Sequence, residues 1–334
     1  MRLVQLANSA QRRVALVDEP HLVLLENAAS IYDLAQSAIS NGGSLTATVE
    51  ALRSAERLVY DDIYAGPSPW KLLTPIDVPG DPQKVLVSGT GLTHLGSARE
   101  RQAMHATPQD EAAMTDSMRI FEWGRKEGRP APGQIGIAPE WFYKGDGFAI
   151  QPPFAPLHIP AFAEDGGEEG EVAAIYLIAG DGTPWRIGMA IGNEFSDHVF
   201  ERRNYLNLAG SKLRTCSLGP ELVLSPPFHD VAGTVRITRA EETVWQKNIR
   251  TGEDNMCHSL QNLEHHHFKF PNHRQPGMVH IHFLGADALS FGEKIRLRDG
   301  DLMEVAFDGF GRPLRNPVAV DSAAPRLVTA RPLN

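Results

Sequence analysis

Cysteine is scarce in this sequence. The 334 residues include only two, Cys216 and Cys257, which lie far apart and match no spacing typical of a metal site or a redox pair. A disulfide framework is therefore excluded as the source of stability, and a chain of this length can bury a large core without one. We expect a protein that works in a reducing compartment.

Long apolar runs and clusters of basic residues are missing as well. No run approaches the ~18 to 20 apolar residues that span a bilayer, and the first twenty residues carry charges where a signal peptide would have an apolar core. Lys and Arg number 32 against 41 Asp and Glu, a net charge of −9 without the basic stripes that nucleic acids need. We therefore expect a cytoplasmic protein with neither a membrane nor a nucleic acid as partner.

The sequence divides into two parts with different patterns of apolar residues. Residues 1–25 alternate apolar and polar side chains in short bursts typical of strands, and residues 27–60 have the apolar spacing of helices, interrupted by a Gly-Gly pair. Prolines and glycines between residues 66 and 82 then indicate a linker. We expect a small N-terminal α+β domain at residues 1–78.

The remainder of the sequence is rich in β patterns. Short runs such as VLVSGTG, EVAAIYLIAG and MVHIHFLG alternate with Gly and Pro turns, and the best helical patterns lie at residues 99–105 and 110–128. Strands without regularly alternating helices favour a roll, sandwich or barrel over a doubly wound sheet. The sequence thus predicts an α+β fold whose catalytic domain is a β-rich roll or sandwich at residues 79–334.

Closely spaced carboxylates precede one of these predicted strands. Glu169 and Glu171 lie two residues apart before VAAIYLI, so on a strand they point to the same side, and Glu194 follows the next apolar run, IGMAIGN. Like charges this close repel unless a cation lies between them, and Mg²⁺ and Mn²⁺ prefer oxygen ligands. A metal site is one interpretation, and a solvated acidic turn followed by a polar loop is the other.

A glycine-rich segment, GTGLTH, covers residues 89–94 and follows a strand that we expect to be buried. Gly91 would let the backbone approach a ligand, and Thr93 beside it is a second candidate contact. His94 has the near-neutral pKa that acid–base chemistry needs. The alternative is a plain turn with a structural histidine, since the segment matches neither GxGxxG nor a Walker pattern.

Arginines and histidines elsewhere offer further candidates. Arg99 and its neighbours are able to bind a substrate carboxylate, or they are simply solvated. In the run Glu264-His265-His266-His267, a strand would place His265 and His267 on one side, where they could share a metal ion. No third ligand is specified, so we favour a lid or the edge of a polar loop.

The order of several motifs resembles the fumarylacetoacetate hydrolase superfamily, and within it the branch of 2-keto-3-deoxy sugar-acid (pentonate or arabonate) dehydratases. The resemblance spans residues 70–320 and implies a β-roll catalytic domain, a homodimer, and Mg²⁺ or Mn²⁺ held by the three glutamates. The motifs are GTGLTH, PEWFYKG (139–145), Glu169-x-Glu171, Asn193-Glu194-Phe-Ser, Ser211-Lys212 with Leu-Gly-Pro, and LGADALSFGEKIRLRDGDLMEV (284–305).

Two lysines match family positions in these motifs. Lys144 follows the aromatic pair in WFYK, and Lys212 precedes the Gly-Pro element, so each would hold charge at a 2-oxo acid or act as a base. The alternative for both is a solvated charge on the surface. Glu140 in PEWFYKG is a candidate proton shuttle or a turn residue, and Asp287 in LGADALSFG joins Arg99 as an expected substrate contact.

Departures from the family pattern bear on the reaction. Glu194 replaces the usual Asp, and His94 is one residue nearer its glycine than expected. Arg296 occupies the place of the glutamate that pairs with a lid histidine to activate water, and His282 stands where a substrate-contacting threonine is expected. An arginine does not replace a general base. These departures favour a lyase over a C–C hydrolase, with His94 and His282 as candidate acids for the leaving group.

We therefore expect a metal-dependent dehydratase that converts a 2-keto-3-deoxypentonate, a small 2-oxo sugar acid, to 2-oxoglutarate semialdehyde. A metal that chelates the carboxylate and keto oxygens would stabilise the enolate formed when the C3 proton leaves, and an acid would help the C4 hydroxyl to depart. The alternatives are a hydrolase of a 2,4-diketo acid or acylpyruvate, a decarboxylase of a 2-oxo diacid, and a non-catalytic sugar-acid sensor.

Overall fold

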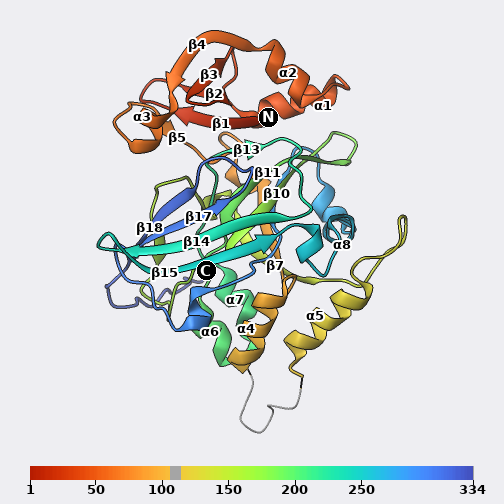
Figure 1. Ribbon diagram of the computed structural model, residues 1–334, viewed down its shortest axis with the longest axis vertical. Coiled ribbons are helices and arrows are strands. Elements are labelled where there is room, and N and C mark those ends of the chain that lie inside the picture. Colours follow the sequence, from red (N-terminus) through yellow and green to blue (C-terminus); the bar gives the residue numbers. More distant parts are fainter. Residues whose placement is uncertain (106–113, 334) are drawn as a thin grey trace.

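The N-terminal residues form an antiparallel layer with helices beside it, drawn in red and orange in Figure 1. The computed structural model describes residues 1–105 and 114–333. Helix α1 begins after Ser30, whose side chain accepts a hydrogen bond from the Asp33 backbone N–H. The elements of this layer are β1 (Arg2–Ala7), β2 (Arg12–Asp18), β3 (His21–Leu25), α1 (Ile31–Ser40), α2 (Leu45–Ala51), β4 (Arg53–Val59), α3 (Tyr60–Ala65) and β5 (Lys71–Leu72).

One part of the helical prediction for residues 27–60 was wrong. The helices end at Ala51, and residues 53–59 form β4, which pairs antiparallel with β3 from His21↔Val59 to Leu25↔Arg53. The helical spacing of this segment is a weak preference, and it gives way because β4 covers the free edge of β3.

The N-terminal strands continue into the main sheet of the molecule. Its order is β4-β3-β2-β1-β13-β11-β10-β16-β6-β7, and β1 joins β13 through Arg2↔Val223 and Leu3↔Leu222. The domain boundary at residue 78 stays a prediction. The remaining strands of this sheet are β6 (Val85–Gly91), β7 (Glu140–Asp146), β8 (Ile150–Gln151), β10 (Gly170–Ile178), β11 (Pro184–Asn193), β12 (Cys216–Leu218), β13 (Leu222–Val223) and β16 (Val279–Phe283).

A second, five-stranded sheet packs against the main one. Apolar side chains fill the space between them, with Val172 and Ile191 from the main sheet in one core with Val235 and Phe307 from the second. This arrangement confirms the predicted α+β class and its β-rich second part. The order of the second sheet is β15 (Glu242–Thr251), β14 (Val231–Arg239), β17 (Leu302–Phe307), β18 (Leu314–Val320) and β9 (Leu157–Ile159).

Helices α4 to α7 cover the end of the roll that lies away from the N-terminal layer, and α8 lies at its side (Figure 1). None of the helices in residues 1–105 and 114–333 is both long and apolar enough to cross a membrane. The two predicted helices correspond to α4 and α5, and residues 110–113 of that prediction lie outside the described residues. The helices are α4 (Leu95–His105), α5 (Asp116–Glu127), α6 (His198–Arg203), α7 (Leu208–Lys212) and α8 (Leu260–Phe268).

The histidine run at 265–267 belongs to α8, so the prediction of a strand, lid or loop edge there was wrong. Ser259 caps this helix by accepting a hydrogen bond from the Asn262 N–H. His266 and His267 are buried, and the helix lies over the sheet with His267 against His280 of β16. The segment is a helix because its N-terminus is capped and one of its faces is buried. Neither feature can be recognised from the letters EHHH alone.

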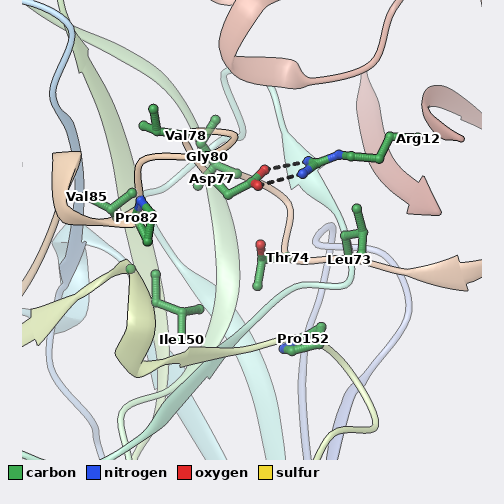
Figure 2. Close-up of a pocket in the computed structure, with 12 residues that line it drawn as sticks. Arg12, Leu73, Thr74, Asp77, Val78, Gly80, Pro82, Val85, Ile150 and Pro152 are labelled. Carbon is green, nitrogen blue, oxygen red and sulfur yellow. Dashed lines mark hydrogen bonds and ion pairs between the residues drawn. The ribbon is translucent and has the colours of Figure 1, made fainter.

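A cavity of about 340 Å³ lies at the seam between the N-terminal layer and the roll (Figure 2). Its charged side chains, Arg12 and Asp77, bind each other through two hydrogen bonds of 2.7 and 2.8 Å. Leu73, Ile76 and Val78 make up much of the remaining wall. Because the two charged side chains bind each other, neither is left to bind a ligand, and we interpret the cavity as a gap between two packed parts of the molecule.

Candidate active site

Three buried carboxylates meet where β10 and β11 lie side by side. Glu169 directly precedes β10, Glu171 is its second residue, and Glu194 follows β11. Antiparallel pairing of Gly170 with Asn193 brings the start of one strand to the end of the other. Each glutamate offers an oxygen, and these atoms all lie within 4.8 Å of one another. We call these three residues the carboxylate trio; the structure brings them together as the sequence predicted.

Two buried lysines reach the trio. The Lys144 ammonium donates to Glu194 Oε1 at 2.7 Å and to the carbonyls of Phe195 and Lys212 at 2.7 and 2.8 Å. The Lys212 ammonium binds Glu169 and Glu194 and lies 4.6 Å from the ring centre of Phe142. All three donors of Lys144 are therefore engaged, whereas the third donor of Lys212 faces an aromatic ring.

The lysines compensate the trio unevenly. Burial works against the charged form of Glu169, but Lys212 and a histidine outweigh it and hold the pKa of Glu169 well below its usual range. Burial and the charges of Glu169 and Glu194 raise the pKa of Glu171 well above its usual range. Burial also lowers the pKa of Lys212, but Glu169 and Glu194 outweigh it and raise that pKa.

The donor set fits a divalent cation. Glu171 is 2% exposed, and its Oε2 accepts a hydrogen bond of 2.7 Å from the backbone N–H of Gly285. No ion pair joins Glu171 to a lysine or arginine in the described part of the chain, although two carboxylates stand beside it. Three clustered carboxylate oxygens are ligands that Mg²⁺ and Mn²⁺ prefer, and such an ion would relieve the repulsion at Glu171.

Glu140 lies on β7, the edge strand next to β6. Its Oε1 accepts hydrogen bonds from Tyr205 at 2.6 Å and from Arg101 at 3.4 Å. Its Oε2 is buried with no partner among the described residues, and a Cβ added at Gly91 would lie 1.9 Å from it. Glycine at position 91 therefore makes room for Glu140, a structural reason for the glycine that sequence analysis assigned to substrate.

Arg101 links Glu140 to α6. It is 8% exposed and forms an ion pair of 2.8 Å with Glu201 of that helix. Arg99, which the sequence analysis selected, is exposed on α4. The side chain of α4 that reaches the site is thus two residues further along.

The hydrogen bonds of His94 and Thr93 among the described residues are with each other and with residues outside the trio. Thr93 Oγ1 donates to the carbonyl of Leu284 at 2.8 Å and lies 2.8 Å from His94 Nδ1, while His94 Nε2 lies 3.1 Å from Thr251 Oγ1. The hydrogen-bond network therefore assigns the proton to Nδ1. Burial lowers the pKa of His94 to about 4, so this ring is neutral at neutral pH.

His282 lies on the other side of the main sheet. It pairs with Ala174 of β10 and Ser88 of β6. Ala174 lies three residues after Glu171 on the same strand and points to the opposite face of the sheet, and the side chain of His282 points to that face as well. Its ring nitrogens lie 2.9 Å from Ser88 Oγ and 2.7 Å from Thr90 Oγ1. The structure therefore does not bring His282 to the trio.

Asp287 and Arg296 lie at the periphery. Asp287 Oδ2 accepts a hydrogen bond of 3.1 Å from the Arg250 N–H, and its backbone carbonyl packs against Gly96 of α4. Arg296 is exposed and donates to the carbonyl of Glu164 at 3.4 Å. These contacts give Asp287 a structural task and leave Arg296 outside the trio.

His198 and Tyr205 also contact site residues, although no sequence motif marked them. His198 Nε2 lies 3.1 Å from Glu169 Oε1, and Tyr205 holds Glu140. Burial works against a charge on His198, but its hydrogen bond and charge interaction with Glu169 raise its pKa. The closeness of His198 to Glu194 in Asn-Glu-Phe-Ser-Asp-His was the one available signal.

The two-sheet roll is a fold that this chain shares with solved enzymes. In particular, the chain is similar to 2-keto-3-deoxy-D-arabinonate dehydratase in its apo form, with a TM-score of 0.71 and 17% identity over 97% of this chain and 100% of that chain. The same enzyme complexed with magnesium and 2,5-dioxopentanoate gives a TM-score of 0.69 at 17% identity, over 96% of this chain and 99% of that chain.

A 5-carboxymethyl-2-hydroxymuconate delta-isomerase from Mycobacterium smegmatis is also similar, with a TM-score of 0.58 and 18% identity over 97% of this chain and 100% of that chain. No protein-family model and no curated protein matches the sequence. At these identities the likeness concerns the fold, and the resemblance read from the motifs is confirmed at that level.

Proposed function

We propose that the protein is a metal-dependent dehydratase that removes water from a 2-keto-3-deoxypentonate and yields 2-oxoglutarate semialdehyde. The observation that carries this proposal is the buried carboxylate trio. Lys212 pairs with Glu194, whereas Glu171 has no ion pair to a lysine or arginine among the described residues and its pKa is raised. A Mg²⁺ or Mn²⁺ ion held by Glu169, Glu171 and Glu194 would supply Lewis-acid stabilisation of an enolate. The solved dehydratase complexed with magnesium and 2,5-dioxopentanoate supports the choice of reaction.

The residues around the trio divide the remaining work. Lys212 keeps its ammonium charge, because its pKa is raised, and pairs with the carboxylate of the anionic substrate. Lys144, with all three donors engaged, fixes the position of Glu194. Glu140 handles protons, since Tyr205 and Arg101 occupy Oε1 and leave Oε2 for the substrate.

The elimination needs one shuttle. The C3–H bond breaks with its proton passing to Glu140 Oε2, and the same proton passes to the C4 hydroxyl as the C4–O bond breaks and water leaves. Tautomerisation of the resulting unsaturated alcohol gives the semialdehyde. No oxidant and no second substrate enter this balance.

The surroundings of His94 favour the lyase over the hydrolase. A hydrolase of a 2,4-diketo acid needs a base that activates water. Both ring nitrogens of His94 are bonded to threonine hydroxyls and its pKa is lowered to about 4, so no carboxylate raises its basicity. Arg296, at the place of the expected glutamate, is exposed.

The test is an assay of 2-keto-3-deoxypentonates and 2,4-diketo acids with the purified protein and Mg²⁺. Aldehyde is followed through a coupled aldehyde dehydrogenase, and pyruvate is measured in the same samples. We expect aldehyde without pyruvate, and loss of turnover with EDTA that excess Mg²⁺ restores. Pyruvate from a 2,4-diketo acid, with the deoxypentonates inert, would assign the protein to the hydrolases instead.

A further inference from the structure

His198 is a buried histidine in contact with the trio. It is the first residue of α6 and is 2% exposed. Asp197 caps this short helix by accepting a hydrogen bond from the Phe200 N–H. The position of the ring is therefore tied to the chain segment that follows Glu194.

Close packing holds the ring in one orientation. A Cβ added at Gly167 would lie 2.3 Å from His198 Nδ1, and the ring of Phe291 lies 5.2 Å away between centres. Gly167 is itself held by paired backbone hydrogen bonds with Ser196 of 2.8 and 3.0 Å. Nδ1 thus faces backbone, and no polar atom of the described residues bonds to it.

Nε2 makes the polar contact, at 3.1 Å from Glu169 Oε1. Lys212 also donates to this oxygen, at 2.5 Å, so Glu169 Oε1 acts as an acceptor and the His198 nitrogen that faces it, Nε2, carries a proton. Two donors on Oε1 leave Oε2 as the oxygen of Glu169 with lone pairs to spare.

We propose that His198 is a positioning residue which, by binding Glu169 Oε1, turns Glu169 Oε2 toward the metal and thereby sets metal affinity. The inference rests on the proposed metal site and goes beyond it, because it concerns a residue outside the trio. The ring is not itself a ligand here: one nitrogen is committed to Glu169 and the other faces Gly167. Partners of this kind typically contribute about 10- to 100-fold to metal affinity.

The test is calorimetric titration of Mg²⁺ and Mn²⁺ into the metal-free full-length protein. His198→Leu removes the donor, and we expect its Kd to rise by about 10- to 100-fold. His198→Gln carries an amide N–H₂ near the place of Nε2, and we expect it to restore affinity to within about threefold of wild type. A role in folding alone would not distinguish Gln from Leu in this way.

Two further variants guard the result. Gly167→Ala presses on Nδ1 without touching the trio, so it should weaken binding in the same direction even if His198→Leu fails to fold. His258→Gln alters a buried histidine that contacts Asn262, and its Kd should equal that of wild type. Unchanged Kd in both folded His198→Leu and Gly167→Ala overturns the inference; a wild type that binds neither ion overturns the proposed metal function and the inference with it.

Discussion

The two faces of the main sheet both bury polar side chains, but they do so by opposite means. Strand β7 contributes Glu140 and Lys144 to one face and Trp141 to the other, because neighbouring residues alternate. The face of Glu140, Lys144 and the trio, here the carboxylate face, is built from ion pairs. The face of Trp141, His280 and His282, covered by His267, is here the histidine face.

The histidine face is a chain of neutral rings. Trp141 Nε1 donates to His267 Nδ1 at 3.1 Å, which leaves the His267 proton on Nε2, 2.9 Å from His280 Nδ1. Burial lowers the pKa of His280 and of His282 to about 3, with neighbouring histidines adding to the effect. A neutral hydrogen-bonded network therefore satisfies most of this side, but His280 Nε2 is buried without a partner among the described residues.

The difference shows what makes one buried polar cluster a candidate catalytic centre. On the histidine face almost every donor meets an acceptor, and charge is absent. On the carboxylate face Glu171 keeps a raised pKa and Glu140 an unbonded oxygen. Carboxylates with a raised pKa or an unbonded oxygen, next to buried charges, mark functional sites more often than networks of neutral rings do.

The largest effect should come from Glu171→Gln. Glutamine accepts the Gly285 N–H as glutamate does but cannot supply a charged ligand, so metal-dependent turnover should fall by about 10³-fold or more. Steady-state kinetics at saturating Mg²⁺ measures it. The metal-free variant should unfold at a urea concentration at least as high as wild type, because a buried carboxylate between two others is gone. Full activity in the variant would remove Glu171 from the metal site.

The next largest effect should come from Lys144→Met, which should lower the free energy of unfolding. It leaves Glu194 with one lysine fewer and the carbonyls of Phe195 and Lys212 without their donor, and breaking a buried ion pair costs roughly 3–5 kcal/mol. Urea unfolding of the metal-free protein measures the loss. Lys84→Met is the matched control, since its pair with Asp81 is exposed and contributes less than about 1 kcal/mol. Equal losses in the two variants would mean that Lys144 is not held as described.

The trio was predictable because its geometry is local. Alternation places Glu169 and Glu171 on one side of a strand, and an antiparallel neighbour returns Glu194 to the same end. The α+β class and the strand-rich second part followed from pattern in the same way. Residues 53–59 did not, because strand formation there depends on the free edge of β3, which is a tertiary fact.

The supporting side chains were not predictable by such rules. Arg101, His198 and Tyr205 approach from helices and loops whose placement no spacing encodes. His280 and His282 alternate in VHIHF, but both faces of β16 are buried, so the pattern does not say which face meets the trio. The homodimer and the roles of Arg99 and Asp287 at substrate stay predictions.

Lowering the pH should change the contributions of the two faces to the free energy of unfolding in opposite directions. A histidine with a folded pKa of about 3 and an unfolded value of about 6.5 keeps its full contribution above pH 6.5 and loses it as pH falls toward 3, by about 1.4 kcal/mol per pH unit. Glu171, with a raised folded pKa, responds in the opposite direction. His280→Asn retains an acceptor near Nδ1, so it should flatten the fall in stability between pH 6 and 4 in urea titrations. A slope equal to that of wild type would show that His280 does not titrate on unfolding.

The smallest effect should come from Trp141→Phe, which tests whether the faces are independent. It removes the N–H that His267 Nδ1 accepts and keeps an aromatic ring, so the loss is that of one partly buried hydrogen bond, about 0.5–1.5 kcal/mol. Trp141 is 37% exposed, so water replaces part of the contact and the lower end is expected. Because the neighbouring residues Glu140 and Phe142 point to the other face, the Kd for Mg²⁺ should stay at the wild-type value while the urea midpoint falls slightly. A weakened Kd would show instead that the histidine network and the carboxylate trio are coupled through β7, and that the two faces form one site.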